Sequence, residues 1–137
     1  MNTQTLYRPV GLKELELIAD SGWTAFPPRL DWQPIFYPVL NLAYAEQIAR
    51  DWNTGDAFSG YCGAVTSFDV DTGYLQQFPV ENVGAEMHNE LWIPAAALDQ
   101  FNKQIRGGIR VVNAFFGSAF TLPQNETIRN TLLNFIP

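Results

Sequence analysis

The 137-residue chain contains a single cysteine, Cys62, and a single histidine, His88. One cysteine cannot form an internal disulfide, and it cannot build a zinc site from several thiolates. A metal would have to be held by His88 together with carboxylates such as Glu86 and Glu90, which is a poor match to the ligand sets of zinc. We therefore predict no metal site, and we expect Cys62 to fill space in the core rather than act as a nucleophile.

Positive charge is also scarce, with 8 Lys and Arg against 14 Asp and Glu and a formal net charge of −6. Non-specific binding to nucleic acid needs clustered cations, so we predict none. No apolar run approaches the roughly 18 residues of a membrane helix, and residues 1–5 lack the pattern of a signal peptide. We expect a cytoplasmic protein that does not enter membranes and whose partner is a small molecule or another protein.

Apolar residues, by contrast, make up 47% of the chain and aromatic residues 14%. That supply is ample for one packed core, and the length is close to the commonest domain size. The sequence has no repeat, no low-complexity segment and no clear linker. We therefore predict that residues 1–137 form a single domain.

Hydrophobic periodicity predicts short strands mixed irregularly with helices. The expected helices cover residues 12–20, 42–52, 94–105 and a C-terminal segment after Asn125, with a helical turn at 74–78; the expected strands cover residues 5–10, 35–37, 63–70, 80–83, 88–93 and 109–116. The pair Gly107-Gly108 is expected to end the helix that starts at Pro94. This order indicates an α+β fold rather than a repeated βαβ sheet.

The expected helix 42–52 has Asn41 as its N-cap, because an asparagine side chain accepts from the free N–H groups of the first turn. Its predicted buried stripe consists of Leu42, Ala45, Ile48, Ala49 and Trp52, at helical spacing.

The clearest alternation in the chain runs from His88 to Ile93. It places His88, Glu90 and Trp92 on one face of the expected strand. The ordinary interpretation of Glu90 is a solvated charge on an exposed face, since glutamates are seldom buried. A face that also carries a tryptophan and the only histidine is more typical of a pocket wall. We therefore take Glu90 as the candidate catalytic residue.

Arg8 is the second residue of interest, because it lies in an otherwise uncharged segment, residues 3–11. Most arginines are surface residues, and the alternative here is a specific contact with an anion, which the planar guanidinium makes well. The chain contains no Walker loop, no G-x-G-x-x-G, no H-E-x-x-H and no G-x-S-x-G, so the common phosphate-binding, metalloprotease and hydrolase motifs are absent.

Five segments of the chain together carry a resemblance to a known family: YRPVGLKEL (7–15), FPPR (26–29), YPVLN (37–41), IARDWN (48–53) and ELWIP (90–94). With them, the chain resembles the ADP-ribosyltransferase-like superfamily, and more narrowly a group of small bacterial proteins labelled ADP-ribosylation/crystallin J1. The resemblance spans residues 5 to 115. It implies two small, mainly antiparallel sheets that form a cleft with flanking helices, and NAD bound in that cleft.

The resemblance also implies roles for individual residues. Arg8 would hold NAD, with Tyr7 beside it, and Glu90 would hydrogen-bond the nicotinamide ribose. Phe36 and Tyr37 resemble the aromatic segment that flanks nicotinamide, the alternative being ordinary core aromatics. His88 stands where relatives that modify arginine carry Gln or Glu, and we count it among the candidate cofactor-binding residues.

Three functions remain open at this point. The first is an NAD-consuming enzyme, an ADP-ribosyltransferase or NAD glycohydrolase, with a protein among its conceivable acceptors. The second is a non-catalytic module that binds a nucleotide, ADP-ribose or a protein on the same fold. The third is an immunity-type partner protein whose acidic surface masks a basic patch, through Asp51, Asp56, Asp69 and Asp71.

Overall fold

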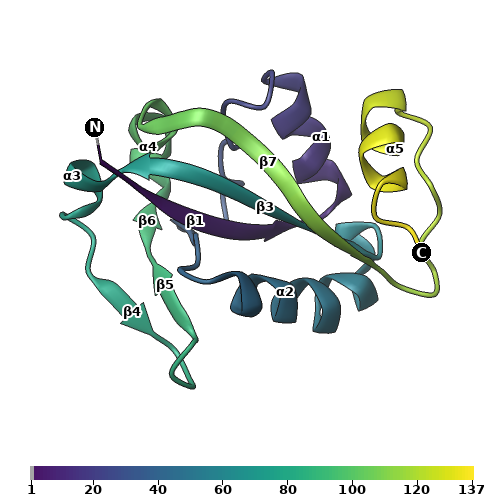
Figure 1. The fold of residues 1–137 in the computed structure, drawn as a ribbon, viewed down its shortest axis with the longest axis horizontal. Helices are drawn as coiled ribbons and strands as arrows, with labels where there is room; N and C mark the ends of the chain where they lie inside the picture. Colours follow the sequence, from purple (N-terminus) through teal and green to yellow (C-terminus); the bar gives the residue numbers. More distant parts are fainter. Residues whose placement is uncertain (1) are drawn as a thin grey trace.

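The central sheet is antiparallel and has the strand order β1-β3-β7, formed by β1 (Thr3–Val10), β3 (Cys62–Asp71) and β7 (Ile105–Phe116). We describe it in a computed structural model, which covers residues 2–137. In the middle strand β3, every residue except Asp69 and Asp71 is buried. A strand buried on both faces needs helices on both sides, and Figure 1 shows helices above and below the sheet.

The helices are short: α1 (Leu12–Asp20), α2 (Leu42–Asp51), α3 (Thr72–Leu75), α4 (Leu98–Lys103) and α5 (Glu126–Leu133). In Figure 1, α1 and α5 lie on one side of the sheet and α2 on the other. Short strands and helices in this irregular order make the fold α+β, as the sequence predicts.

The larger core lies on the face that α1 and α5 cover, and aromatic rings fill its centre. The ring of Phe26 lies 5.0 Å from that of Phe36 and 4.8 Å from that of Phe68, and Phe36 lies 5.5 Å from Phe101. All four side chains are at most 2% exposed. Tilted and edge-on pairs at these spacings are favourable beyond the area they bury, so Phe36 has a structural role in this core.

The smaller core lies between the sheet and α2, whose N-cap is Asn41 as predicted, with its side chain accepting from the Tyr44 N–H. Ala45 and Ala49 are fully buried against Val39 and Val65. Small residues let the helix approach the sheet closely.

The predicted buried stripe of this helix is wrong at both ends. Leu42 is 38% exposed and Trp52 is 61% exposed. Ala45 and Ala49 make the contact with the sheet, Leu42 lies outside this core, and Trp52 lines a cleft beside the helix instead of packing on a strand.

Two further sheets of two strands each pair β2 (Ile35–Phe36) with β6 (Ile93–Pro94), and β4 (Val80–Asn82) with β5 (Asn89–Leu91). The single strand predicted for residues 88–93 is therefore divided at Trp92. On one side of this residue the chain pairs with β4, and on the other it pairs with β2. Alternation alone cannot reveal this, because the side-chain pattern continues through the change of partner.

The helix predicted to continue to Ile105 and end at Gly107-Gly108 ends instead at Lys103, and β7 already begins at Ile105. Gly107 and Gly108 have φ of 78° and 82° and lie inside the strand. Arg106 and Ile109 are opposite consecutive residues of β3, so the two glycines form a bulge. The Ile109 N–H donates to the Trp23 carbonyl at 2.8 Å, which fixes the strand on the far side of the bulge.

Residue Val39 connects the central sheet to the β4–β5 pair. It exchanges two hydrogen bonds with Tyr7, at 3.0 and 2.8 Å, and forms a bridge with Glu90 on its other side. In an antiparallel ladder the next such exchange would involve residue 9, which is Pro9 and has no N–H to donate. The pairing therefore stops, and the edge of β1 from Arg8 onward is open.

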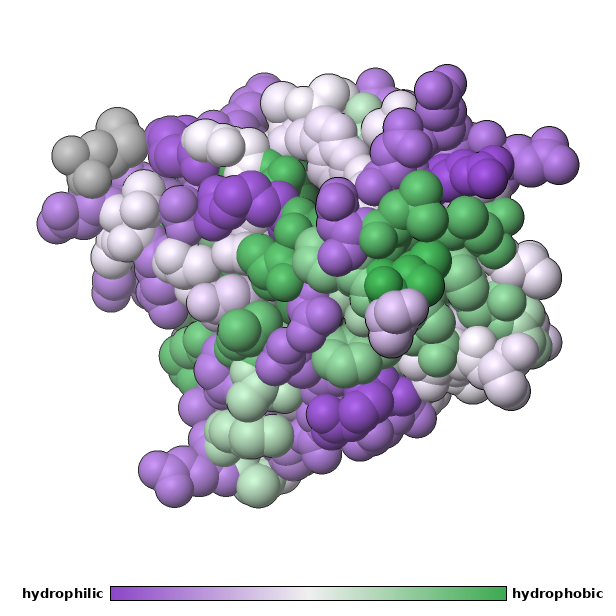
Figure 2. Space-filling model, turned by 45° about the vertical axis from the view of Figure 1, so that its right-hand side comes forward, coloured by the Kyte–Doolittle hydropathy of each residue, from purple (hydrophilic) through white to green (hydrophobic). Residues whose placement is uncertain are grey.

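Elsewhere the surface carries several exposed hydrophobic residues. Figure 2 shows hydrophobic side chains gathered on the side of the molecule where β7 ends and α5 lies in Figure 1. Val112 and Leu133, from these two elements, are 40% and 50% exposed. Within residues 2–137, no helix has the length and apolar character needed to span a bilayer.

Candidate functional site

A cleft of about 540 Å³ opens beside the free edge of β1. Its walls come from the end of β1, the first turn of α1, one side of α2, and the β4–β5 pair. Both main candidates of the sequence analysis, Arg8 and Glu90, line it, together with Tyr37. Residues far apart in sequence are brought together here because Pro9 stops the sheet from closing.

Glu90 is held by two neutral hydrogen-bond donors. The Tyr44 hydroxyl donates to Oε2 at 2.6 Å, and the Trp92 indole Nε1–H donates to Oε1 at 2.9 Å. No cation within residues 2–137 forms an ion pair with it. The carboxylate is therefore fixed in orientation while its negative charge is not neutralised. The predicted shared face of Glu90 and Trp92 is confirmed by their contact.

Tyr44 connects Glu90 to His88. Its side chain is largely buried, and its ring centroid lies 4.7 Å from that of His88. Burial, together with the hydrogen bond to Glu90 and the nearby negative charge, raises the pKa of Tyr44 well above its ordinary value. The phenol therefore stays protonated and remains a donor.

The imidazole of His88 is held on both nitrogens. Nδ1 accepts from the Ala85 N–H at 3.0 Å, and Nε2 lies 2.9 Å from Oε1 of Gln47. This pattern assigns the proton of the neutral ring to Nε2, which then donates to Gln47. His88 does not line the cleft, so its contact with the site is through the Tyr44 ring.

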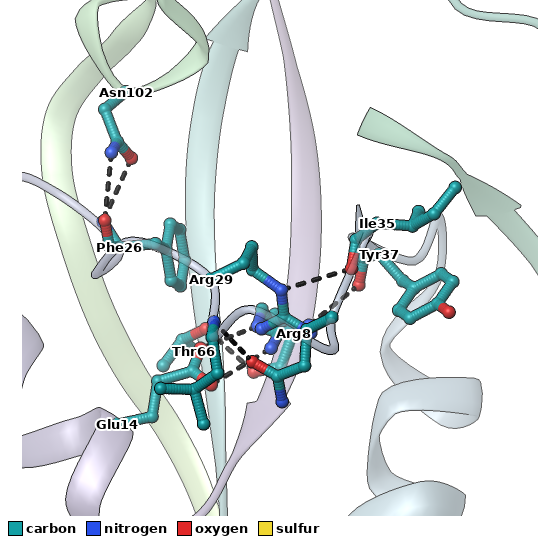
Figure 3. A network of polar contacts seen from close by, with 10 residues as sticks. Arg8, Glu14, Phe26, Arg29, Ile35, Tyr37, Thr66 and Asn102 are labelled. Atoms are coloured by element: carbon teal, nitrogen blue, oxygen red, sulfur yellow. Dashed lines mark hydrogen bonds and ion pairs between the residues drawn. The ribbon is translucent and has the colours of Figure 1, made fainter. Parts of the chain in front are cut away.

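Arg8 is paired with Glu14, which the sequence analysis did not identify as a site residue. Nε and Nη2 donate to the two Glu14 oxygens at 2.7 and 3.0 Å, and Nη1 donates to the Tyr37 carbonyl at 3.3 Å (Figure 3). The guanidinium carbon also lies 4.6 Å above the centre of the Phe36 ring. Arg8 is only 8% exposed, and these contacts occupy three of its five N–H donors.

A second arginine, Arg29, lies beside this pair in Figure 3 and also lines the cleft. Its Nε donates to the Ile35 carbonyl at 3.1 Å. Burial, followed by repulsion from Arg8, lowers its pKa below the ordinary arginine value. An anion in the cleft would relieve this repulsion, so Arg29 is suited to contact a phosphate.

The other two predicted cofactor-binding residues lie outside the cleft. Tyr7 packs with the core under α2, and Phe36 is fully buried beneath Arg8. Both residues position residues that line the cleft. Tyr7 forms backbone hydrogen bonds with Val39, and the ring of Phe36 packs under the guanidinium of Arg8.

The structure adds Tyr44, Glu14, Arg29 and Glu81 to the residues around the site. Glu81 lies directly opposite Glu90 on β4, so the two side chains share a face. Glu14 and Arg29 lie inside the segments YRPVGLKEL and FPPR, and Tyr44 could have been found from its spacing on α2. Tyr44 lies one helical turn before Ile48 and two turns before Trp52, so the three side chains share one side of the helix. An aromatic side chain stands at each end of this row.

Of the remaining reactive and acidic residues, Asp56 lines the cleft, whereas Cys62, Asp51, Asp69 and Asp71 do not. Cys62 is fully buried, and burial raises the pKa of its thiol to about 12. Asp51 is the last residue of α2, and Asp56 lies near the start of β3, where its carbonyl accepts from the Tyr61 N–H. Asp69 and Asp71 lie toward the other end of β3, about 30 Å from its start for a strand of 10 residues. These four carboxylates do not form a single acidic patch. Among residues 2–137, no three His, Cys, Asp or Glu side chains are grouped to hold a metal.

Comparison of the chain with protein-family models, curated proteins and solved structures finds no match.

Proposed function

We propose that the cleft binds NAD and that the protein breaks the bond between nicotinamide and ribose, as an ADP-ribosyltransferase or an NAD glycohydrolase. The observation that carries this proposal is the state of Glu90. It is a carboxylate on the wall of a cleft, fixed by Tyr44 and Trp92 through both oxygens and paired with no cation among the described residues. Such a group is suited to stabilise positive charge that develops on a bound substrate.

In the proposed reaction the carbon–nitrogen bond breaks and its electron pair leaves with nicotinamide. Positive charge then develops on the ribose ring and its C1 carbon, facing Glu90. A fixed negative charge stabilises this state more than the ground state, which is the requirement for catalysis. Water or the hydroxyl, amine or amide of an acceptor adds to C1 and gives up a proton. Arg29 and Lys13, which also line the cleft, supply positive charge for the diphosphate.

The test is release of nicotinamide from NAD, followed by chromatography. Glu90→Gln keeps the shape and removes the charge, so we expect it to slow release roughly 100- to 1,000-fold, the range found when one preorganised electrostatic group is removed. Glu86→Gln is the matched control, because Glu86 is exposed and outside the cleft. If the wild-type protein releases no nicotinamide, or if both variants release it at the wild-type rate, the proposed chemistry is wrong.

One observation favours the second candidate, a module that binds NAD or ADP-ribose without turnover. Arg8, the residue expected to hold the cofactor, is committed to Glu14 and to the core. Calorimetric titration with NAD separates the two candidates, because binding without release of nicotinamide supports the module.

A further inference from the structure

Two large aromatic side chains are exposed where the cleft meets the end of α2. Trp52 is 61% exposed and Phe58, from the 3₁₀ turn η2 (Ala57–Ser59), is 73% exposed, and both line the cleft. Rings of this size are normally buried, and a group of them at a cavity is typical of a binding surface. Each offers a flat π-face on which another ring can stack.

Between these two aromatics in the sequence lies Asn53, a buried amide with an unmet hydrogen bond. It is 5% exposed and lines the same cleft. Its Nδ2 donates to Ser59 Oγ at 2.9 Å, and Ser59 Oγ donates its own proton to Asp56 Oδ2 at 2.6 Å. The Ser59 oxygen must therefore accept from Asn53, and this fixes which end of the amide is the oxygen.

The Oδ1 atom of Asn53 has no hydrogen-bond partner within residues 2–137. A buried acceptor without a donor is destabilising, and native proteins seldom keep one without a reason. An N–H donor of a ligand in the cleft would satisfy it once the side chains that cover this atom shift to admit the donor. The segment that carries Ser59 packs directly against Gly11. This close approach requires a glycine, because a Cβ at residue 11 would lie 2.6 Å from the Ser59 Cα.

The distance along α2 relates this group to Glu90. Tyr44, which holds Glu90, and Trp52 lie on the same side of the helix as Ile48. At a rise of about 1.5 Å per residue, Trp52 is about 12 Å further along the axis than Tyr44. A dinucleotide, in which two ribose units and a diphosphate separate two bases, suits two subsites spaced in this way.

We propose that Trp52, Phe58 and Asn53 form a subsite for the adenine base of the bound nucleotide, with the ring against the aromatic side chains and its exocyclic amine donating to Asn53 Oδ1. This inference rests on the proposed function for the identity of the ligand, and it adds the class of base and the residues that recognise it. Asp56, held beside Asn53 through Ser59, provides a further carboxylate oxygen for a ribose hydroxyl.

The test is calorimetric titration with AMP, which carries the base without nicotinamide. We expect the wild-type protein to bind AMP and Trp52→Ala to bind it roughly tenfold more weakly, within the range measured for loss of base stacking. Trp32→Ala is the matched control, since Trp32 is 71% exposed and does not line the cleft. Both tryptophans are exposed, so neither variant should fail to fold.

The contact with Asn53 is tested without changing the protein, by comparing AMP with purine riboside 5′-monophosphate, which lacks the exocyclic amine. We expect the analogue to bind roughly tenfold more weakly, because it leaves Oδ1 without a donor. Equal binding of the two nucleotides overturns the contact with Asn53.

The results separate this subsite from the proposed reaction. If the wild-type protein releases nicotinamide but does not bind AMP, the subsite is overturned and the reaction stands. The same conclusion follows if the wild-type protein releases nicotinamide and Trp52→Ala binds AMP as tightly as the wild-type protein does. Binding of AMP that Trp52→Ala weakens, in a protein that releases no nicotinamide, supports the subsite and overturns the reaction.

Discussion

The two sides of the cleft each present a glutamate whose two oxygens both accept hydrogen bonds, but the donors differ in charge. On the α1 side, Glu14 accepts from the guanidinium of Arg8. On the β5 side, Glu90 accepts from a phenol and an indole. The first carboxylate is neutralised by its partner, and the second is only oriented.

This difference separates a structural carboxylate from one available for chemistry. An ion pair with two charge-assisted bonds satisfies both charges and leaves little field in the cleft. Neutral donors hold a carboxylate in place and leave its negative charge to act on whatever binds. Residue type alone would not distinguish Glu14 from Glu90, because the distinction lies in their donors.

Removing the cation from the α1 side should have the largest effect. Arg8→Ala leaves Glu14 without its partner and removes the contact with Phe36, so we expect the free energy of unfolding to fall by about 3 kcal/mol. Urea denaturation measures this change. Arg50→Ala is the control, because its ion pair with Asp51 is more than half exposed on both sides and should change stability by about 0.5 kcal/mol or less. Equal losses in the two variants would contradict the structural role of the Arg8 pair.

Neutralising each glutamate in turn should give different results on the two sides. Glu14→Gln leaves the buried Arg8 charge uncompensated, and we expect a loss of about 2 kcal/mol in the free energy of unfolding. Glu90 has no cationic partner, so Glu90→Gln leaves no charge uncompensated, and we expect the free energy of unfolding to change by about 0.5 kcal/mol or less. Denaturation of both variants at one pH makes the comparison. A greater loss for Glu90→Gln would reverse our assignment of the two carboxylates.

Removing one neutral donor from the β5 side should have a smaller effect on stability. Tyr44→Phe deletes the hydroxyl that holds Oε2 of Glu90, and we expect a loss of about 1 kcal/mol. We also expect nicotinamide release to slow roughly tenfold, since a mobile carboxylate is positioned less well. Tyr74→Phe serves as the control, because the Tyr74 hydroxyl makes no hydrogen bond within residues 2–137. Release at the wild-type rate in Tyr44→Phe would show that Trp92 alone suffices.

The smallest effect concerns pH. The pKa of Tyr44 is raised in the folded protein, so above about pH 10 the unfolded chain loses this proton while the folded protein keeps it. Stability should therefore fall as pH rises above this value, and the fall should be shallower in Tyr44→Phe. Urea midpoints at pH 9, 10 and 11 provide the measurement. Parallel curves for the two proteins would contradict the raised pKa.

Much of the local structure was predictable because the deciding interactions are local. The limits of α1, the cap at Asn41 and the start of the C-terminal helix after Asn125 depend on residues within one turn. The glycines at 107 and 108 were misassigned because a helix end and a strand bulge use the same left-handed conformation. The strand after the bulge is fixed by a hydrogen bond from the Ile109 N–H to the Trp23 carbonyl. Trp23 is far from this segment in the chain, so the local sequence does not reveal the contact.

The site was predictable only in part, for the same reason. Arg8, Tyr37 and Glu90 do line one cleft, but the pairing of Arg8 with Glu14 and of Glu90 with Tyr44 depends on how helices pack on the sheet. Trp52 was predicted to be buried because a large apolar residue at helical spacing normally is. Its exposure depends on the cleft beside the helix, whose other walls come from distant parts of the sequence.

Pro9, which is itself one of the lining residues, gives the cleft a property that depends on the backbone rather than on a side-chain contact. Because the missing N–H is a matter of covalent structure, no fluctuation of the backbone can extend the ladder from Tyr7–Val39 along the edge of β1. The Tyr37 carbonyl, which would have accepted from residue 9, accepts instead from Arg8. The opening therefore exists before any ligand arrives, and no free energy of binding is consumed in separating strands.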